Sequence, residues 1–255
     1  MIGRALLVLA LLMSVGAAGA ETAVDQPAEC RVAQHLIENG IPLPHVAKAI
    51  AAKRLSILVL GAGSSLLPGP TGAQNAYPAR LRSALAEKLP GIEITLTTDV
   101  KPRRTALEMA KALPDDLAAV KPDLVIWQTG TVDAMQGLEQ DQFSQALDKG
   151  IAKARAAGAD VVLVNSQYSP RTESIIALGT YGETMRWVAV QHEIPLFDRF
   201  SVMKLWGDLG TFDLYSATKK LDIAGRVHDC IGRLLADLIV DAAKVEAPPQ
   251  QAPAK

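Results

Sequence analysis

A serine, a histidine and two aspartates are the residues of this chain whose types could together hydrolyse an ester. Ser64 follows an apolar run that ends at Gly61. A serine hydroxyl is a weak nucleophile that needs a general base, and a histidine oriented by a carboxylate commonly supplies one. His228 is the candidate base, with Asp222 or Asp229 to orient it. These residues are far apart in the sequence, so the fold must bring them together.

Each of these residues also has a structural alternative. A serine at the start of a helical segment commonly caps it, which is the alternative for Ser64 and for its neighbour Ser65. His228 lies inside a helical pattern, where a partly exposed structural histidine is the alternative. The sequence has neither a C-x-x-C motif nor the Cys/His spacing of a zinc site, so we expect no metal and no cofactor.

Short apolar runs alternate with helical patterns along most of the chain, and Gly or Pro marks several of the returns from helix to strand. The predicted strands are residues 56–60, 92–97, 124–127, 161–164 and 196–197. The predicted helices are residues 45–53, 77–89, 105–119, 142–157, 181–192 and about 221–243. We expect Trp127, Trp187 and Trp206 to be packing residues.

This alternation predicts an α/β fold: a flavodoxin-like, three-layer αβα sandwich with about five parallel strands. Ligands of such sheets bind at the carboxyl ends of the strands, near the switch point in strand order. Functional residues are therefore expected directly after the strands, in residues 61–65, 98–104, 128–133, 165–170 and 198–200.

The strand ends resemble those of the SGNH, or GDSL, hydrolase superfamily. The matching stretches are VLGAGSS (59–65), KPDLVIWQTGT (121–131), AGADVVLV (157–164), QYSP (167–170) and IPLFDRF (194–200), and the likeness spans nearly all of residues 50–240. Members of this superfamily are serine esterases, lipases and carbohydrate O-acetylesterases. The resemblance implies a nucleophilic Ser after the first strand, and oxyanion donors from a Gly after the second strand and an Asn after the third. It also implies an Asp-x-x-His motif before the last helix.

The first two motifs depart from this pattern. Gly63 stands where the family has its nucleophile, and Ser64 falls one residue late. The second motif should contain a glycine, but residues 97–104, which include Arg103 and Arg104, contain none. A side chain there would crowd the approach of a substrate oxygen to the backbone amide.

The last two motifs depart as well. In the third, Gly130-Thr131-Val132-Asp133, Val132 occupies the Asn position and cannot donate a hydrogen bond. Loss of one oxyanion donor typically lowers the rate by about 10²–10³. If the last helix keeps the family register, Lys219 replaces the acid and Asp222 replaces the base. The resemblance therefore implies the fold, while four altered motifs favour loss of the chemistry.

The fold argument brings basic residues near the pocket from two stretches, after the second strand and before the last helix: Lys101, Arg103, Arg104, Lys219 and Lys220. The chain as a whole carries a net charge of −1, so a local basic cluster indicates an anion site. Uronic acids, phosphates or peptidoglycan carboxylates would suit it. The alternative is a solvated surface whose counter-charges are Asp99, Asp115, Asp116 and Asp222.

The chain ends carry signals of their own. Arg4, the apolar run 5–17 and the A-x-A site at 18–20 predict a signal peptide over residues 1–20, with an uncleaved anchor as the alternative. We expect an N-terminal strap over residues 21–50, the SGNH hydrolase-like domain over 51–243, and a disordered tail rich in Pro and Gln over 244–255. Export favours a disulfide between Cys30 and Cys230.

Two functions follow as hypotheses. The first is a periplasmic or secreted SGNH-like protein that has lost ester hydrolysis and binds carbohydrate or other anionic material of the cell envelope. The second is an active esterase with a shifted site, Ser64 with His228 and Asp222 or Asp229. The charge balance indicates no nucleic-acid partner, and no stretch after the leader is apolar enough to span a membrane. A third reading, an unrelated flavodoxin-like binding domain, lacks support because the Gly-rich phosphate fingerprint is incomplete.

Overall fold

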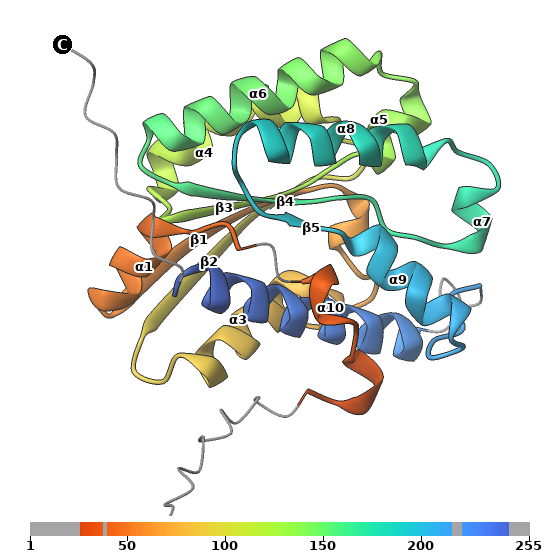
Figure 1. The fold of residues 1–255 in the computed structure, drawn as a ribbon, viewed down its shortest axis with the longest axis horizontal. Helices are drawn as coiled ribbons and strands as arrows, with labels where there is room; N and C mark the ends of the chain where they lie inside the picture. The colour runs from red at the N-terminus through yellow and green to blue at the C-terminus, as the bar shows by residue number, and fades with distance from the viewer. Residues whose placement is uncertain (1–25, 38–39, 216–220, 245–255) are drawn as a thin grey trace, which may run out of the picture.

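Five parallel strands form the middle layer of the protein (Figure 1). The computed structural model describes residues 26–37, 40–215 and 221–244. The strands are β1 (Arg54–Gly61), β2 (Glu93–Val100), β3 (Leu124–Gln128), β4 (Asp160–Val164) and β5 (Leu196–Phe197). Their order in the sheet is β2-β1-β3-β4-β5, and all four pairings are parallel. The predicted three-layer α/β fold is confirmed.

Helices cover both faces of the sheet because side chains of one strand point alternately to opposite faces. Ile57 and Val59 of β1 belong to one apolar core, and Leu58 and Leu60 belong to the other. The first core is closed by α1 (Pro44–Ala51), α3 (Tyr77–Lys88), α9 (Arg199–Asp208) and α10 (Leu221–Ala242). The second is closed by α4 (Ala106–Val120), α6 (Gln140–Ala156) and α8 (Leu178–Gln191).

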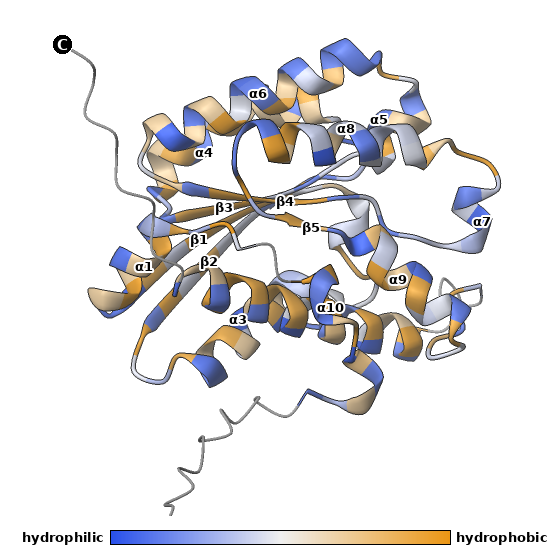
Figure 2. Cartoon of the chain, viewed as in Figure 1, coloured by the Kyte–Doolittle hydropathy of each residue, from blue (hydrophilic) through white to orange (hydrophobic). Residues whose placement is uncertain are grey.

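Hydropathy follows this layering. Every residue of β3 and β4 is buried, as expected for parallel strands that helices cover on both faces. In Figure 2 apolar colour runs along the central strands, while polar residues lie along the outer helices. Trp127 of β3 and Trp206 of α9 are fully buried, but Trp187 of α8 is 64% exposed. The expectation that Trp187 packs in the core was therefore wrong: Met185 and Val188 face the core, and Trp187 lies between them on the outer side.

The remaining elements are short. They are η1 (Ala28–Cys30), η2 (Gln34–Leu36), η3 (Gly63–Ser65), α2 (Gly72–Asn75), α5 (Thr131–Gln136) and α7 (Pro170–Glu173). Of these, η1 and η2 precede α1, and the others join strands to the long helices. Three of them, η3, α5 and α7, lie in the loops after β1, β3 and β4, where functional residues were expected. The sequence did not predict α5, α7 or α9, because each of these stretches is short or lacks a strong apolar period.

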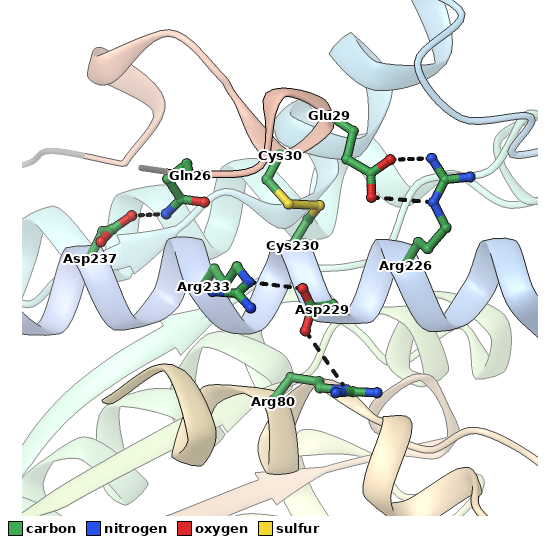
Figure 3. The surroundings of a disulfide bond; sticks show 9 residues. All are labelled: Gln26, Glu29, Cys30, Arg80, Arg226, Asp229, Cys230, Arg233 and Asp237. Atoms are coloured by element: carbon green, nitrogen blue, oxygen red, sulfur yellow. Dashed lines mark hydrogen bonds and ion pairs between the residues drawn. A yellow bond between two sulfur atoms is a disulfide. The ribbon is translucent and has the colours of Figure 1, made fainter. Parts of the chain in front are cut away.

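The N-terminal segment is held against α10 by a disulfide. The bond joins Cys30 to Cys230 with their Cα atoms 4.9 Å apart, which confirms the predicted pair. Figure 3 shows polar contacts on either side of it, one from Glu29 to Arg226 and one from Gln26 to Asp237. No helix in the described ranges is long and apolar enough to cross a membrane.

Candidate functional site

The two serines after β1 have different surroundings. Ser65 is fully buried, and its hydroxyl donates to Gln128 Oε1 at 2.6 Å and lies 3.2 Å from the hydroxyl of Tyr77. A Cβ atom on Gly61 would lie 2.3 Å from Ser65 Oγ, so this glycine makes room for the serine. Ser65 is therefore a structural residue. Ser64 Oγ is also buried, yet it makes no hydrogen bond within the described part of the chain.

Gly63 and Ser64 line a pocket of about 310 Å³ at the carboxyl end of the sheet. Its other walls come from the loop after β4, from α9 and from α10, so the topology brings together segments distant in sequence. The polar residues around it are Ser64, Gln167, Ser169, Thr172, Arg199 and His228. Much of the remaining lining is apolar, including Leu66, Leu67, Pro68, Met203, Leu214 and Val227.

His228 reaches the pocket from α10. It is only 5% exposed, so the alternative of a partly exposed histidine was wrong. The reason is the helical period: His228 lies three residues before Ile231 and seven before Leu235, and both of these are buried in the core. Burial, and then the positive charge of Arg199, lowers the pKa of His228 to about 3. The ring is therefore neutral at any physiological pH.

The hydrogen bond of His228 fixes which ring nitrogen carries the proton. The backbone amide of Tyr77 donates to Nδ1 at 2.9 Å. A neutral imidazole whose Nδ1 accepts a hydrogen bond must carry its hydrogen on Nε2. A catalytic base needs the opposite tautomer, with Nδ1–H donating to a carboxylate and Nε2 open to receive a proton. In this structure Nε2 is a donor.

Neither candidate carboxylate orients His228. Asp222 lies exposed in the first turn of α10. Asp229 is engaged by Arg233 at 2.9 Å and Arg80 at 3.8 Å (Figure 3). Either carboxylate would have to accept a hydrogen bond from Nδ1, but Nδ1 itself accepts one from the Tyr77 amide. The structure thus brings Ser64 and His228 to one pocket, and neither candidate carboxylate completes a triad there.

Arg199 is the residue of this pocket that sequence reasoning missed. It is the first residue of α9, and its side chain is fully buried. Its Nη1 donates to the carbonyl oxygen of Ser64 at 3.0 Å, and its Nη2 donates weakly to Gln167 Oε1 at 3.4 Å. The guanidinium also lies 5.5 Å from the centroid of the Tyr77 ring. Nε has no hydrogen-bond partner in the described ranges.

No carboxylate in the described part of the chain forms an ion pair with Arg199. The neighbouring carboxylate, Asp198, forms an ion pair with Arg186 at 2.6 Å. It also accepts hydrogen bonds from the side-chain amide of Asn165 at 2.7 Å and from the backbone amide and hydroxyl of Ser201. Burial lowers the pKa of Arg199 to about 10, which leaves it charged at neutral pH. The only sequence signal was an arginine two residues after the last strand, in the stretch IPLFDRF.

The third motif has a structural role. Asp133 is fully buried and accepts hydrogen bonds from the Gly130 amide at 2.9 Å, the Thr129 hydroxyl at 2.8 Å and the Ala106 amide at 2.7 Å. It therefore joins the first turns of α4 and α5. Asp133 accepts the hydrogen bond of the Gly130 amide, and the Val132 side chain has no polar atom, so neither that amide nor that side chain offers a donor to a substrate oxygen.

The predicted basic cluster lies after β2, and its described members do not line the pocket. Arg104 is buried against Asp99, and Lys101 Nζ lies 3.2 Å from the same carboxylate. Burial opposes ionisation of Asp99, but the hydrogen bonds from Arg104 and Lys101 outweigh it and lower its pKa. Arg103 is exposed, with its carbonyl bonded to Gln136. Lys219 and Lys220 lie outside the described residues.

The fold and the pocket define a class of protein. A five-stranded parallel sheet between helical layers, with a pocket at the carboxyl ends of its strands, is the fold of SGNH hydrolases. A family model described as "Non-GDSL lipase-like family" matches residues 29–245. The chain belongs to this non-GDSL lipase-like family.

Solved structures of esterases and lipases share the fold. TesA is 23% identical, with a TM-score of 0.53 over 74% of this chain and 98% of its own. Axe2, an acetylxylan esterase from Geobacillus stearothermophilus, is 17% identical, with a TM-score of 0.56 over 75% and 95%. A lipase/acylhydrolase from Enterococcus faecalis is 18% identical, with a TM-score of 0.53 over 70% and 97%. No curated protein matches the chain in sequence.

Proposed function

We propose that this protein is an exported SGNH-like protein that no longer hydrolyses esters and instead binds anionic cell-envelope or carbohydrate material in the pocket beside Ser64. The observation that carries this proposal is the tautomer of His228. With Nδ1 accepting from Tyr77, the ring presents a donor to the pocket and cannot take a proton from Ser64. A serine without a base is a poor nucleophile.

Three further features support a binding role. Ser64 Oγ makes no hydrogen bond in the described ranges, Val132 replaces an oxyanion donor, and Gly63 takes the usual nucleophile position. The pocket is nevertheless retained, and it contains a buried cation. The disulfide favours an oxidising compartment, in agreement with the predicted leader at residues 1–20, which lies outside the described residues.

Ester hydrolysis is the direct test. The purified, disulfide-bonded protein should hydrolyse p-nitrophenyl acetate no faster than its Ser64→Ala variant, because the wild-type serine has no base to activate it. Circular dichroism and thiol titration should show that both proteins are folded and oxidised. Turnover that vanishes in both Ser64→Ala and His228→Ala would establish the alternative, an active esterase with a shifted site, and would overturn this proposal.

A further inference from the structure

A buried cation that has no carboxylate partner among the described residues lines the pocket. Transfer of a charged group from water into a protein interior is unfavourable unless hydrogen bonds or an opposite charge compensate it. Arg199 is fully buried, and the acceptors found for it are a carbonyl and a side-chain amide, which are both neutral. A guanidinium has five N–H groups, and these two bonds use two of them.

The groups beside Arg199 are also donors. His228 presents Nε2–H because its Nδ1 is occupied, and Ser64 has a hydroxyl without a partner in the described ranges. A guanidinium, an imidazole N–H and a hydroxyl lining one small pocket form a set that would hydrogen-bond an anion. Because the set contains a single net positive charge, a singly charged anion would neutralise it, whereas a doubly charged phosphate would leave a buried negative charge.

The rest of the pocket selects the body of the ligand. Leu66, Leu67, Pro68, Met203, Leu214 and Val227 line it beside the donors. Burial of apolar ligand surface against such side chains stabilises a complex. A volume of about 310 Å³ is that of a small-molecule site. A sugar, with hydroxyl groups on most of its carbons, would leave many of them without partners on this wall.

We propose that the pocket binds the carboxylate of a small monocarboxylic acid, with the carboxylate at Arg199, His228 and Ser64 and an aliphatic body on the apolar wall. This inference rests on the proposed function, in that it treats the pocket as a binding site for an anion, and among the ligands proposed there it selects an aliphatic carboxylic acid over a carbohydrate. It differs from the predicted anion site after β2, where Arg104 and Lys101 already pair with Asp99.

Titration calorimetry with octanoate tests the proposal on the whole oxidised protein at pH 7.5. Octanoate should bind, whereas 1-octanol, octyl phosphate and galacturonate should bind at least 10-fold more weakly. Arg199→Gln should weaken octanoate binding about 10- to 100-fold, because hydrogen bonds to a charged group are lost. Lys111→Gln, which removes an exposed charge from α4, should leave the affinity unchanged.

A second variant covers the case in which Arg199→Gln does not fold. Ala224→Phe keeps Arg199 and fills the apolar side of the pocket, so it should abolish octanoate binding. Octanol binding as tightly as octanoate, no octanoate binding at all, or unchanged affinity in a folded Arg199→Gln would overturn the inference. Tighter binding of galacturonate or octyl phosphate would replace it with a uronic-acid or phosphate site. Hydrolysis of p-nitrophenyl acetate that depends on Ser64 would overturn the proposed function alone.

Discussion

His228 decides the chemistry of the site at the scale of single residues. A histidine in the same pocket as a serine would support hydrolysis if its Nδ1 contacted a carboxylate. Here Nδ1 accepts from the Tyr77 amide, and Arg199 adds a positive charge nearby. Both interactions favour the neutral ring. The sequence placed His228 near the site, but it could not reveal the tautomer, because the donor lies 151 residues away.

The stability of the protein should depend on pH through this histidine. The folded pKa is about 3, and an unfolded histidine titrates near 6.5. As the pH falls, the unfolded state therefore binds the proton first. The neutral histidine contributes its full share of the unfolding free energy above about pH 6.5, and this share is lost as the pH falls toward 3. Between pH 7 and pH 5 the loss is about 2 kcal/mol.

Urea unfolding of the wild type and of His228→Asn at pH 7 and pH 5 measures this effect. Asparagine retains an acceptor for the Tyr77 amide but has no titrating ring, so the wild type should lose about 2 kcal/mol more than the variant over this range. Equal losses in the two proteins would show that the histidine is protonated as easily in the folded state as in the unfolded state.

Close contact between α3 and α10 shapes the protein at the scale of elements. A Cβ atom on Gly232 of α10 would lie 2.6 Å from the backbone nitrogen of Leu81 in α3, which is too close for any side chain. This contact fixes α10 where His228 can receive the Tyr77 amide at the start of α3. The site therefore depends on a helix pair as well as on the strand ends.

Gly232→Ala should destabilise the protein by about 1–3 kcal/mol, because the two helices must move apart. Gly225→Ala, in the same helix, is the matched control. Within the described ranges, and apart from its chain neighbours and the nearby backbone of its own helix, no atom lies within 4 Å of the added methyl group. Alanine also favours the helix, so this variant should gain about 0.5–1 kcal/mol. Thermal unfolding of both variants gives the comparison. A Gly232→Ala variant as stable as the wild type would contradict the tight contact between α3 and α10.

The elements themselves could largely be read from the sequence, and the exceptions have physical reasons. The five strands and six of the helices were predicted within a few residues, because apolar runs of limited length and helical periods are local signals. The residues of the pocket were harder to predict from the sequence. Arg199 was overlooked because an arginine next to a strand is usually solvated, and only the packing of α9, α10 and the loop after β4 buries it.

The disulfide acts at the scale of the whole molecule. Cys30 and Cys230 are separated by 200 residues, so the bond closes a loop that includes the complete sheet. Such a loop restricts the unfolded chain, and removal of a native disulfide from a small secreted domain typically costs about 2–5 kcal/mol. The bond also fixes η1 beside α10, because Cys230 lies in this helix, two residues after His228.

A variant with Cys30→Ser and Cys230→Ser should therefore lose about 2–5 kcal/mol of unfolding free energy relative to the oxidised wild type. Denaturant titration with and without a reductant measures it. The wild type should fall to the level of the variant when reduced, and the variant should not respond to the reductant. Identical wild-type curves in both conditions would contradict the predicted stabilisation.

The same bond gives the covalent structure the form of a ring with two tails. Every strand, and every residue of the pocket from Gly63 to His228, lies within the ring. A protease that cuts one exposed peptide bond, for instance beside Ile175, which is 79% exposed, would open the ring without separating its parts. The cut protein would keep its mass in a non-reducing gel and divide into two pieces only after reduction.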